Sequence, residues 1–217
     1  MKYKILIPAA LFMFFAYGSS LAQRDSKADK ILKEVSAKYK SYKSLTADFK
    51  LEIENQKDKT KTTETGKIII KGNMYKLELK DQEIVSDGKS IWTYLKEANE
   101  VQINAANSKN DDAISPTRIF TIYESGFRTK YAGEKKSGGI ALQHIELVPE
   151  DSKKPYFKIQ LSINKAQDYI TSAKILNKDG TTLTYSVNKF NPDMPAPDNL
   201  FSFDTSKHPG VEVVDLR

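Results

Sequence analysis

The chain has 217 residues, of which 29% are charged and 39% hydrophobic, and its formal net charge is +6. This length and composition suit one globular domain with a sizeable core. The absence of cysteine excludes disulfides and thiolate metal sites, and the lack of a dense Arg/Lys stripe argues against a nucleic-acid-binding protein. The net positive charge is compatible with a weak attraction to anionic membrane surfaces.

The first 22 residues have the features of a cleavable secretory signal peptide. Two lysines precede an apolar run from Ile5 to Tyr17, and small side chains at positions 20 and 22 stand where signal peptidase would cut before Gln23. The run is shorter than the roughly 20 residues that a membrane-spanning helix needs. No Cys follows the cleavage point, so acylation of the mature N-terminus is not expected. We expect residues 1–22 to be removed and residues 23–217 to form one exported, soluble domain.

The hydrophobic spacing changes from a helical to a strand period near Thr46. From Asp29 to Tyr42, apolar residues stand three and four positions apart, which predicts one amphipathic helix. Beyond it, Phe49, Leu51 and Ile53 alternate with charged residues, as in a strand that is wet on one face. The sequence therefore predicts a helix followed by a sheet.

The alternation continues through further strands. After a polar turn at residues 55–60 and a break at Gly72-Asn73, it places Tyr75, Leu77 and Leu79 on one side of a strand. Consecutive antiparallel strands are the simplest interpretation.

A hairpin with unusually large apolar residues comes next. Asp87-Gly88 is a strong turn signal, and Trp92 and Tyr94 follow on the outgoing strand. An ordinary core hairpin would explain this pattern as well as a functional surface would.

A different pattern fills residues 115–126. Ser115-Pro116 opens and Gly126 closes an apolar-rich turn and a half, which is typical of a short capped helix. Its apolar residues are Ile119, Phe120, Ile122 and Tyr123. The segment could be a lid over the sheet or a plain connector packed on it.

Strand patterns return at residues 140–148, 157–163, 169–177 and 182–190, the last two joined by a second turn at Asp179-Gly180. A proline-rich bend then leads to a last apolar run at residues 211–214. In total we expect roughly nine or ten strands, with two or three short helices, in one domain without internal repeats.

Catalytic motifs are not apparent. His144 and His208 stand outside any metal-spaced cluster, and Asp111-Asp112 lie in a polar loop where solvated acids are expected. The sequence holds no nucleophile elbow and no glycine-rich phosphate loop. We expect neither an enzyme nor a cofactor. Amphipathic strands that curve around one another present an apolar face that is filled by side chains or occupied by a ligand, and periodicity alone leaves both outcomes open.

Two motifs carry a resemblance to a known family. The first is Ile84-Val85-Ser86-Asp87-Gly88-Lys89 with Ile91-Trp92-x-Tyr94, and the second is Phe201-x-Phe203 followed by Pro209-Gly210-Val211-x-Val213. The order of the helix, the Gly66–Ile70 strand and the Ser115-Pro116 segment supports them. The chain resembles, over nearly its whole mature length, the periplasmic outer-membrane lipoprotein carriers of the LolA family.

The resemblance implies a mainly β fold with a few helices: an incomplete, unclosed antiparallel β-barrel whose helices cover an apolar concave face. It implies a monomeric periplasmic chaperone that takes acylated lipoproteins from an inner-membrane transporter, shields their acyl chains and passes them to an outer-membrane acceptor. It implies no metal and no nucleic acid. The implied lipid-binding residues are Phe49, Leu51, Ile53, Tyr75, Leu77, Leu79, Trp92, Tyr94, Ile119, Phe120, Ile122 and Tyr123.

The chain departs from the family pattern at one point. The family often has an Arg-Pro pair after the second strand, followed four residues after the Arg by an aromatic residue. Here Lys71-Gly72-Asn73-Met74-Tyr75 is one residue shorter, so Tyr75 matches the aromatic residue and the Arg is absent. Because Gly cannot replace the hydrogen bonds of Arg, the way in which a lid would be latched stays open.

Two alternatives to lipoprotein carriage remain. A related periplasmic lipid-binding or envelope-stress-sensing protein could use the same fold, and an enzyme or structural module is a third reading. A sensor would need an anchor or a second domain, and an enzyme would need a convergent polar cluster, so the carrier is favoured.

Overall fold

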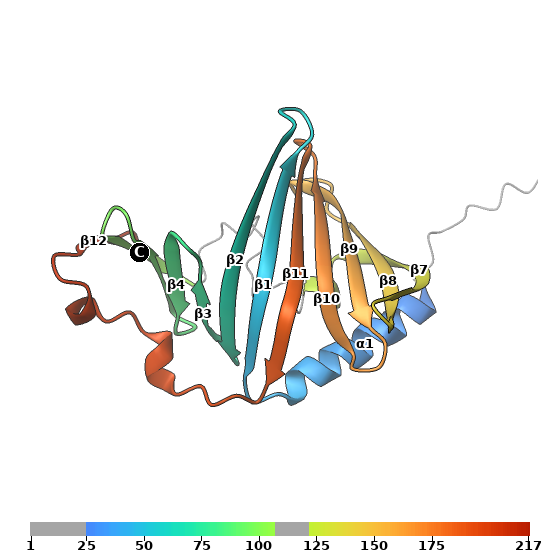
Figure 1. Ribbon diagram of the computed structural model, residues 1–217, viewed down its shortest axis with the longest axis horizontal. Coiled ribbons are helices and arrows are strands. Elements are labelled where there is room, and N and C mark those ends of the chain that lie inside the picture. Colours follow the sequence, from blue (N-terminus) through green and yellow to red (C-terminus); the bar gives the residue numbers. More distant parts are fainter. Residues whose placement is uncertain (1–24, 107–121) are drawn as a thin grey trace, which may run out of the picture.

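The computed structural model describes residues 25–106 and 122–217, whose strands form one twelve-stranded sheet (Figure 1). The helical elements are α1 Ser26–Ser41 and the 3-10 turns η2 Ile122–Glu124, η3 Asp198–Phe201 and η4 Thr205–Lys207. The strands are β1 Leu45–Asn55, β2 Thr60–Lys71, β3 Met74–Glu78, β4 Gln82–Ser86, β5 Ser90–Leu95, β6 Glu100–Ala105, β7 Phe127–Ser137, β8 Ile140–Pro149, β9 Tyr156–Asn164, β10 Tyr169–Asn177, β11 Thr181–Pro192 and β12 Glu212–Asp215.

The sheet is open and almost wholly antiparallel. Its strand order is β12-β6-β5-β4-β3-β2-β1-β11-β10-β9-β8-β7, and only the β12–β6 pair is parallel. The long strands β2, β1, β11 and β10 stand in the middle, and α1 crosses the β7–β10 end (Figure 1). This confirms the expected mainly β, unclosed fold.

Two strands were not predicted from the sequence. β6 and β7 raise the count above the nine or ten expected. In β7 the inward positions Phe127, Thr129 and Tyr131 carry only two apolar residues before a lysine-rich end, so the alternation is too short to stand out.

Helix α1 starts at a capped turn and buries one side. The Asp25 carboxylate accepts hydrogen bonds from the backbone N–H groups of Lys27 and Ala28 at 3.0 and 3.2 Å, so the helix begins three residues before the predicted Asp29. Its side chains Ala28, Ile31, Leu32 and Val35 join a core with residues of β7–β10. We call the side of the sheet that bears α1 the inner face, and the opposite side the outer face.

Both predicted Asp-Gly turns are confirmed. Gly88 and Gly180 have φ values of +86° and +94°, which favour glycine. The Asp87 carboxylate accepts hydrogen bonds from the backbone N–H groups of Lys89 and Ser90 at 2.8 and 2.7 Å. These contacts fix the β4–β5 hairpin.

The C-terminal segment covers the outer face at the β3–β6 end. Phe201 is 1% exposed, and the ring centroids of Phe203 and Tyr94 are 5.4 Å apart. The chain then adds β12 beside β6 as the parallel edge strand.

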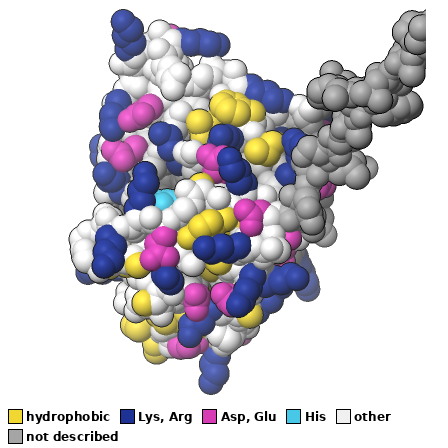
Figure 2. Space-filling model, turned by 90° about the vertical axis from the view of Figure 1, so that its right-hand side faces the viewer, with side chains coloured by type: hydrophobic (Ala, Val, Ile, Leu, Met, Phe, Trp, Pro, Cys, Tyr) yellow, Lys and Arg dark blue, Asp and Glu magenta, His cyan; other side chains and the backbone are white. Residues whose placement is uncertain are grey.

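No helix within the described ranges is long and apolar enough to cross a membrane. The β7 end of the molecule, shown in Figure 2, carries many Lys and Arg side chains with Asp and Glu between them.

Candidate functional site

The register of the central strands assigns their side chains to the two faces, because directly paired residues share a face. Ala47 pairs with Ile68, and Ile68 pairs with Leu77 across β1, β2 and β3. This row lies on the inner face, beside the part that α1 covers. Ten side chains form a second apolar cluster there, which we call the inner patch: Ala47, Phe49, Leu51, Ile68, Ile70, Leu77, Leu79, Ile84, Tyr185 and Val187.

Burial within the inner patch is graded. Phe49 and Leu77 are 6% and 2% exposed, whereas Leu51, Leu79 and Ile84 are only partly buried. The patch is therefore packed at its base and keeps partly exposed apolar side chains around it. A site that binds apolar chains needs such a surface.

Six predicted lipid-binding residues lie on or beside this surface as expected from their alternation. Tyr75 is buried and pairs with Ile70 of the patch. Ile53 is half-buried and continues the β1 row, where it pairs with Leu183. Phe49, Leu51, Leu77 and Leu79 belong to the patch itself. The structure brings these six side chains together on one face.

Gly66 shapes the patch, a role that strand alternation does not predict. A Cβ at this position would lie 2.6 Å from Phe49 Cζ and 2.7 Å from Leu79 Cδ2. Only glycine therefore lets these two side chains meet over β2. The available signal was an isolated glycine inside a strand, which often marks a close approach.

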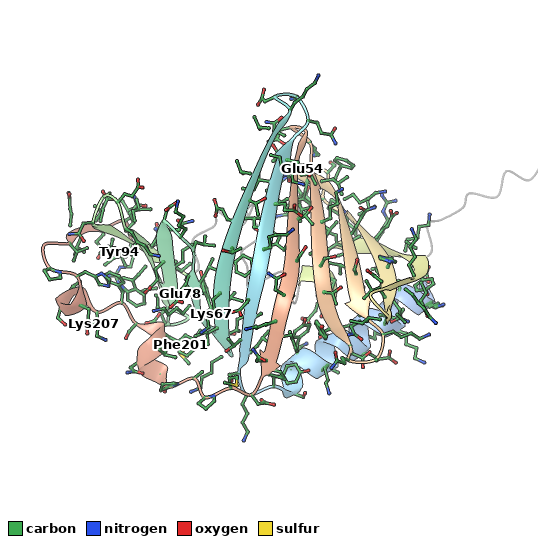
Figure 3. All side chains as sticks on the ribbon, in the orientation of Figure 1. Glu54, Lys67, Glu78, Tyr94, Phe201 and Lys207 are labelled. Carbon is green, nitrogen blue, oxygen red and sulfur yellow. The ribbon has the colours of Figure 1, made fainter. Side chains whose placement is uncertain are left out.

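Trp92 and Tyr94 do not belong to this set. Lys67, Glu78, Glu83 and Tyr94 are successive partners across β2, β3, β4 and β5, so Tyr94 lies on the charged outer face, as Figure 3 shows for the labelled members. Trp92 shares that face because it is two residues from Tyr94 on one strand.

Tyr94 is covered on this face by the C-terminal segment. Tyr94 contacts Phe203 and also His208, with ring centroids 4.3 Å apart in the second pair, and its hydroxyl donates a 3.0 Å hydrogen bond to Asn99. At this end of the sheet the outer face is the one that the C-terminal segment buries.

The outer face of the strands that carry the inner patch is polar. Lys61 lies 3.1 and 2.8 Å from carboxylate oxygens of Glu52 and Glu54, and Lys76 lies 3.1 Å from Glu83. Hydrogen bonds from Lys61 and Lys50 lower the pKa of Glu52. These ion pairs make the outer face of β1–β4 polar, so that on these strands the inner face is the apolar one.

The predicted 115–126 helix is only partly within the described residues. Ile119 and Phe120 lie outside them, and Ile122 begins the 3-10 turn η2. Tyr123 is 6% exposed within the α1 core instead of lying over the inner patch, and burial raises its pKa. Glu124 is tied to α1 because Ser36 donates a hydrogen bond to it and Lys40 lies 2.7 Å away.

Lys71 precedes Gly72, the residue that stands where the family often has Arg. Its ammonium donates hydrogen bonds to the carbonyl of Ala196 at 3.1 Å and to Asp198 Oδ1 at 2.6 Å. It therefore holds the C-terminal segment at the end of β2.

The two histidines lie away from the inner patch. His144 Nδ1 is 3.2 Å from Ser162 Oγ, and His208 stacks on Phe203 at 4.6 Å. Within residues 25–106 and 122–217, no group of three or more His, Asp or Glu side chains is placed to hold a metal ion. The chemistry available on the inner patch is non-directional apolar contact.

Comparison with known proteins identifies the family. Residues 40–204, which are more than half of the chain, match the family described as outer membrane lipoprotein carrier protein LolA. The chain therefore belongs to the LolA family.

Two relatives are similar over most of the chain. An uncharacterised protein of Methanocaldococcus jannaschii is 29% identical over 205 residues, which cover 94% of this chain but only 58% of the relative, so the chain spans less than two thirds of that protein. An outer-membrane lipoprotein carrier protein of Pasteurella multocida is 24% identical over 223 residues, which cover 100% of this chain and 99% of the relative.

Solved structures share the fold. An uncharacterised conserved protein from Thermus thermophilus has a TM-score of 0.60 at 13% identity and covers 87% of this chain and 99% of its own. MucB has a TM-score of 0.52 at 14% identity and covers 88% of this chain and 66% of its own. At these identities the likeness extends to the fold alone.

Proposed function

We propose that this LolA-family protein binds the acyl chains of lipoproteins on the inner patch and carries them through the periplasm from the inner to the outer membrane. The only partly buried side chains of Leu51, Leu79 and Ile84 beside the packed base of Phe49 and Leu77 are the observation that carries this proposal. An apolar surface that a filled core would have buried is suited to a hydrocarbon ligand.

The energetics of the cargo explain why a carrier needs such a surface. At about 0.8 kcal/mol per CH₂, exposing a 16-carbon acyl chain to water costs on the order of 12 kcal/mol. Apolar contact supplies compensation without directional hydrogen bonds. The same contacts can therefore hold different chains and release them when a stronger apolar site is offered.

The carrier role sets the partners and the compartment. The cargo would be acylated lipoproteins, delivered by an inner-membrane transporter and received by an outer-membrane acceptor. Export would follow from the predicted signal peptide. The identity of the Pasteurella relative as an outer-membrane lipoprotein carrier protein supports this role.

The proposal is tested by placing a carboxylate at two neighbouring inward positions. Leu79→Asp changes a half-buried side chain at the edge of the patch, and Leu77→Asp changes one that is 2% exposed at its base. We expect Leu79→Asp to lose most binding of a triacylated lipopeptide while its melting temperature falls only slightly. Leu77→Asp buries an unpaired carboxylate and should unfold the protein, at a cost of about 3 kcal/mol or more.

Glu78→Gln on the outer face is the matched control and should change neither property. A folded Leu79→Asp protein that binds the lipopeptide as well as the wild type would contradict the assignment. A fluorescent fatty acid, measured beside the lipopeptide, separates lipoprotein carriage from a more general lipid-binding role, because only a general binder would hold both with similar affinity.

A further inference from the structure

Three elements bring lysines together at the lower corner of the β7–β10 end. They are the first turn of α1, the β7–β8 hairpin and the turn between β9 and β10. Lys27 and Lys165 come from the first and the last of these, and Lys135 and Lys136 come from the hairpin. All four side chains are exposed. We call these lysines, together with Ile140, the basic corner.

Electrostatic contacts show that these elements are close to one another. Lys165 Nζ lies 2.8 Å from Glu134 Oε2. This hydrogen bond lowers the pKa of Glu134, and Lys27 and Lys136 lower it further. One exposed carboxylate is thus shared by three lysines from α1, β7 and the β9–β10 turn, which leaves positive charge unmatched.

The nearby acids of α1 offset only part of this charge: Lys27 helps to lower the pKa of Asp25, but both acids are bonded to β7. Asp25 accepts a 2.8 Å hydrogen bond from the backbone N–H of Tyr131 as well as capping α1. Asp29 accepts a 2.7 Å hydrogen bond from the Thr129 hydroxyl. Lys27 meanwhile places its ammonium 3.8 Å from the centroid of the Tyr131 ring. The acids therefore fasten the helix to β7, and the lysines remain at the surface.

An apolar side chain projects from the same corner. Ile140 is 44% exposed and begins β8, directly after the Gly138-Gly139 turn. In the hairpin register it pairs with Ser137 and shares a face of the sheet with Lys135, whereas Lys136 lies on the other face. An exposed aliphatic side chain at the tip of a hairpin that carries lysines suits the interface of an anionic membrane.

We propose that the basic corner binds the surface of anionic phospholipid membranes, with the lysines on the headgroups and Ile140 in the interface. This surface is separate from the inner patch, and its role goes beyond acyl-chain carriage. It would hold the protein transiently at a membrane, where cargo is taken up or delivered. Hydrophobic side chains lie among the charged ones on this end of the molecule in Figure 2.

The test uses the mature protein and two kinds of vesicle, one of pure phosphatidylcholine and one with a quarter phosphatidylglycerol. Cosedimentation should detect binding only to the vesicles with phosphatidylglycerol, and added salt should weaken it. At ~1 kcal/mol for each lysine near an anionic surface, removing two positive charges should weaken binding by about 30-fold. The Lys135→Glu/Lys136→Glu variant should show at least this loss.

Two controls match these changes. Lys57→Glu/Lys59→Glu makes the same charge change in the exposed turn between β1 and β2 and should affect binding much less. Ile140→Ser should weaken binding several-fold, whereas Phe157→Ser, at a side chain that is 47% exposed elsewhere on the sheet, should not.

Three results would overturn the proposal: no preference for phosphatidylglycerol, equal losses in the two charge-reversal variants, or full binding by Lys135→Glu/Lys136→Glu. Lipopeptide binding is measured on the same samples. Its retention in the corner variants would show that the inner patch and the basic corner act separately, so that either assignment can fail alone.

Discussion

The ammonium of Lys71 lies 2.6 Å from the Asp198 carboxylate, and the same group donates a hydrogen bond to the carbonyl of Ala196. These contacts join the end of β2 to the start of η3 and to the residues just before it. Immediately after them, Phe201 enters the outer face and becomes almost wholly buried. Lys71 therefore fixes where the C-terminal segment starts to cover the sheet, a different task from latching a lid over the inner face.

Replacing Lys71 by Met should loosen that segment without unfolding the protein. Asp198 is largely exposed, so the ion pair itself contributes at most about 1 kcal/mol. We expect faster backbone hydrogen exchange at residues 197–203 and a nearly unchanged melting temperature. Lys67→Met, on the same strand and exposed, is the control, and equal exchange in both variants would show that Lys71 does not position the segment.

The contact between η2 and α1 should weaken in acid. Hydrogen bonds from Lys40 and Ser36 hold the pKa of Glu124 below its ordinary value of 4.5. A carboxylate whose pKa is lower in the folded state stabilises the fold above the unfolded-state pKa, and this contribution disappears as the pH falls through the folded-state pKa. Glu124→Gln should therefore lower the melting temperature at neutral pH and have no effect at a pH below the folded-state pKa. An effect of the same size at both pH values would contradict the role of the charge.

Two tyrosines, Tyr39 on α1 and the buried Tyr123 beside it, should respond in opposite ways to loss of their hydroxyls. Tyr123 Oη is buried and has no hydrogen-bond partner among the described residues, so Tyr123→Phe removes an unsatisfied group and should leave stability equal or higher. Tyr39 Oη accepts a 3.1 Å hydrogen bond from the backbone N–H of Ile170. Tyr39→Phe leaves that backbone N–H without its acceptor. It should lower the free energy of unfolding by about 1–3 kcal/mol, as measured by urea unfolding. A destabilised Tyr123→Phe protein would show that this hydroxyl has a stabilising contact.

Local patterns were enough to predict most of the fold. Strict alternation at residues 49–53 and 75–79 and the two Asp-Gly turns predicted strands and hairpins that the structure contains. These signals depend on neighbours in the sequence, which is why they could be recognised. β7 was missed because its inward side depends on Tyr131 and Thr129, whose partners are on α1.

Which side chains form the site depends on contacts between distant parts of the chain, and the alternation along one strand does not reveal these contacts. Leu79 and Tyr94 each stand on an amphipathic strand. The register across the strands places Leu79 on the inner face and Tyr94 on the outer face. The cover for Tyr94 comes from Phe203 and His208, more than a hundred residues later in the chain. Only the strand register across β2–β5 shows that the two side chains lie on different faces of the sheet.

Export is tested by the mass of the processed protein. If residues 1–22 form a signal peptide, the periplasmic form should begin at Gln23. Intact-mass measurement of the protein from the periplasmic fraction decides this. Retention of the first 22 residues would contradict both the predicted cleavage and the periplasmic, soluble form of the carrier.

The close approach of Phe49 and Leu79 over Gly66 makes one further prediction about the inner patch. In Gly66→Ala, the new Cβ would lie 2.6 Å from Phe49 Cζ, 2.7 Å from Leu79 Cδ2 and 2.9 Å from the backbone carbonyl of Glu78. The two side-chain tips can move but the carbonyl belongs to the sheet, so the strain should displace Phe49 and Leu79 into the patch. We expect a loss of about 1–3 kcal/mol in the free energy of unfolding, together with weaker lipopeptide binding.

Phe49→Leu provides the compensating change, because it removes the ring that the new methyl group meets. Combined with Gly66→Ala, it should cost less than the sum of the two single changes by about 0.5 kcal/mol or more, as expected for residues in contact. Urea unfolding of the four proteins in this cycle measures the coupling. Additive costs would mean that Phe49 does not pack over Gly66. The inner patch would then lack the close-packed base that supports the partly exposed side chains of Leu51 and Leu79.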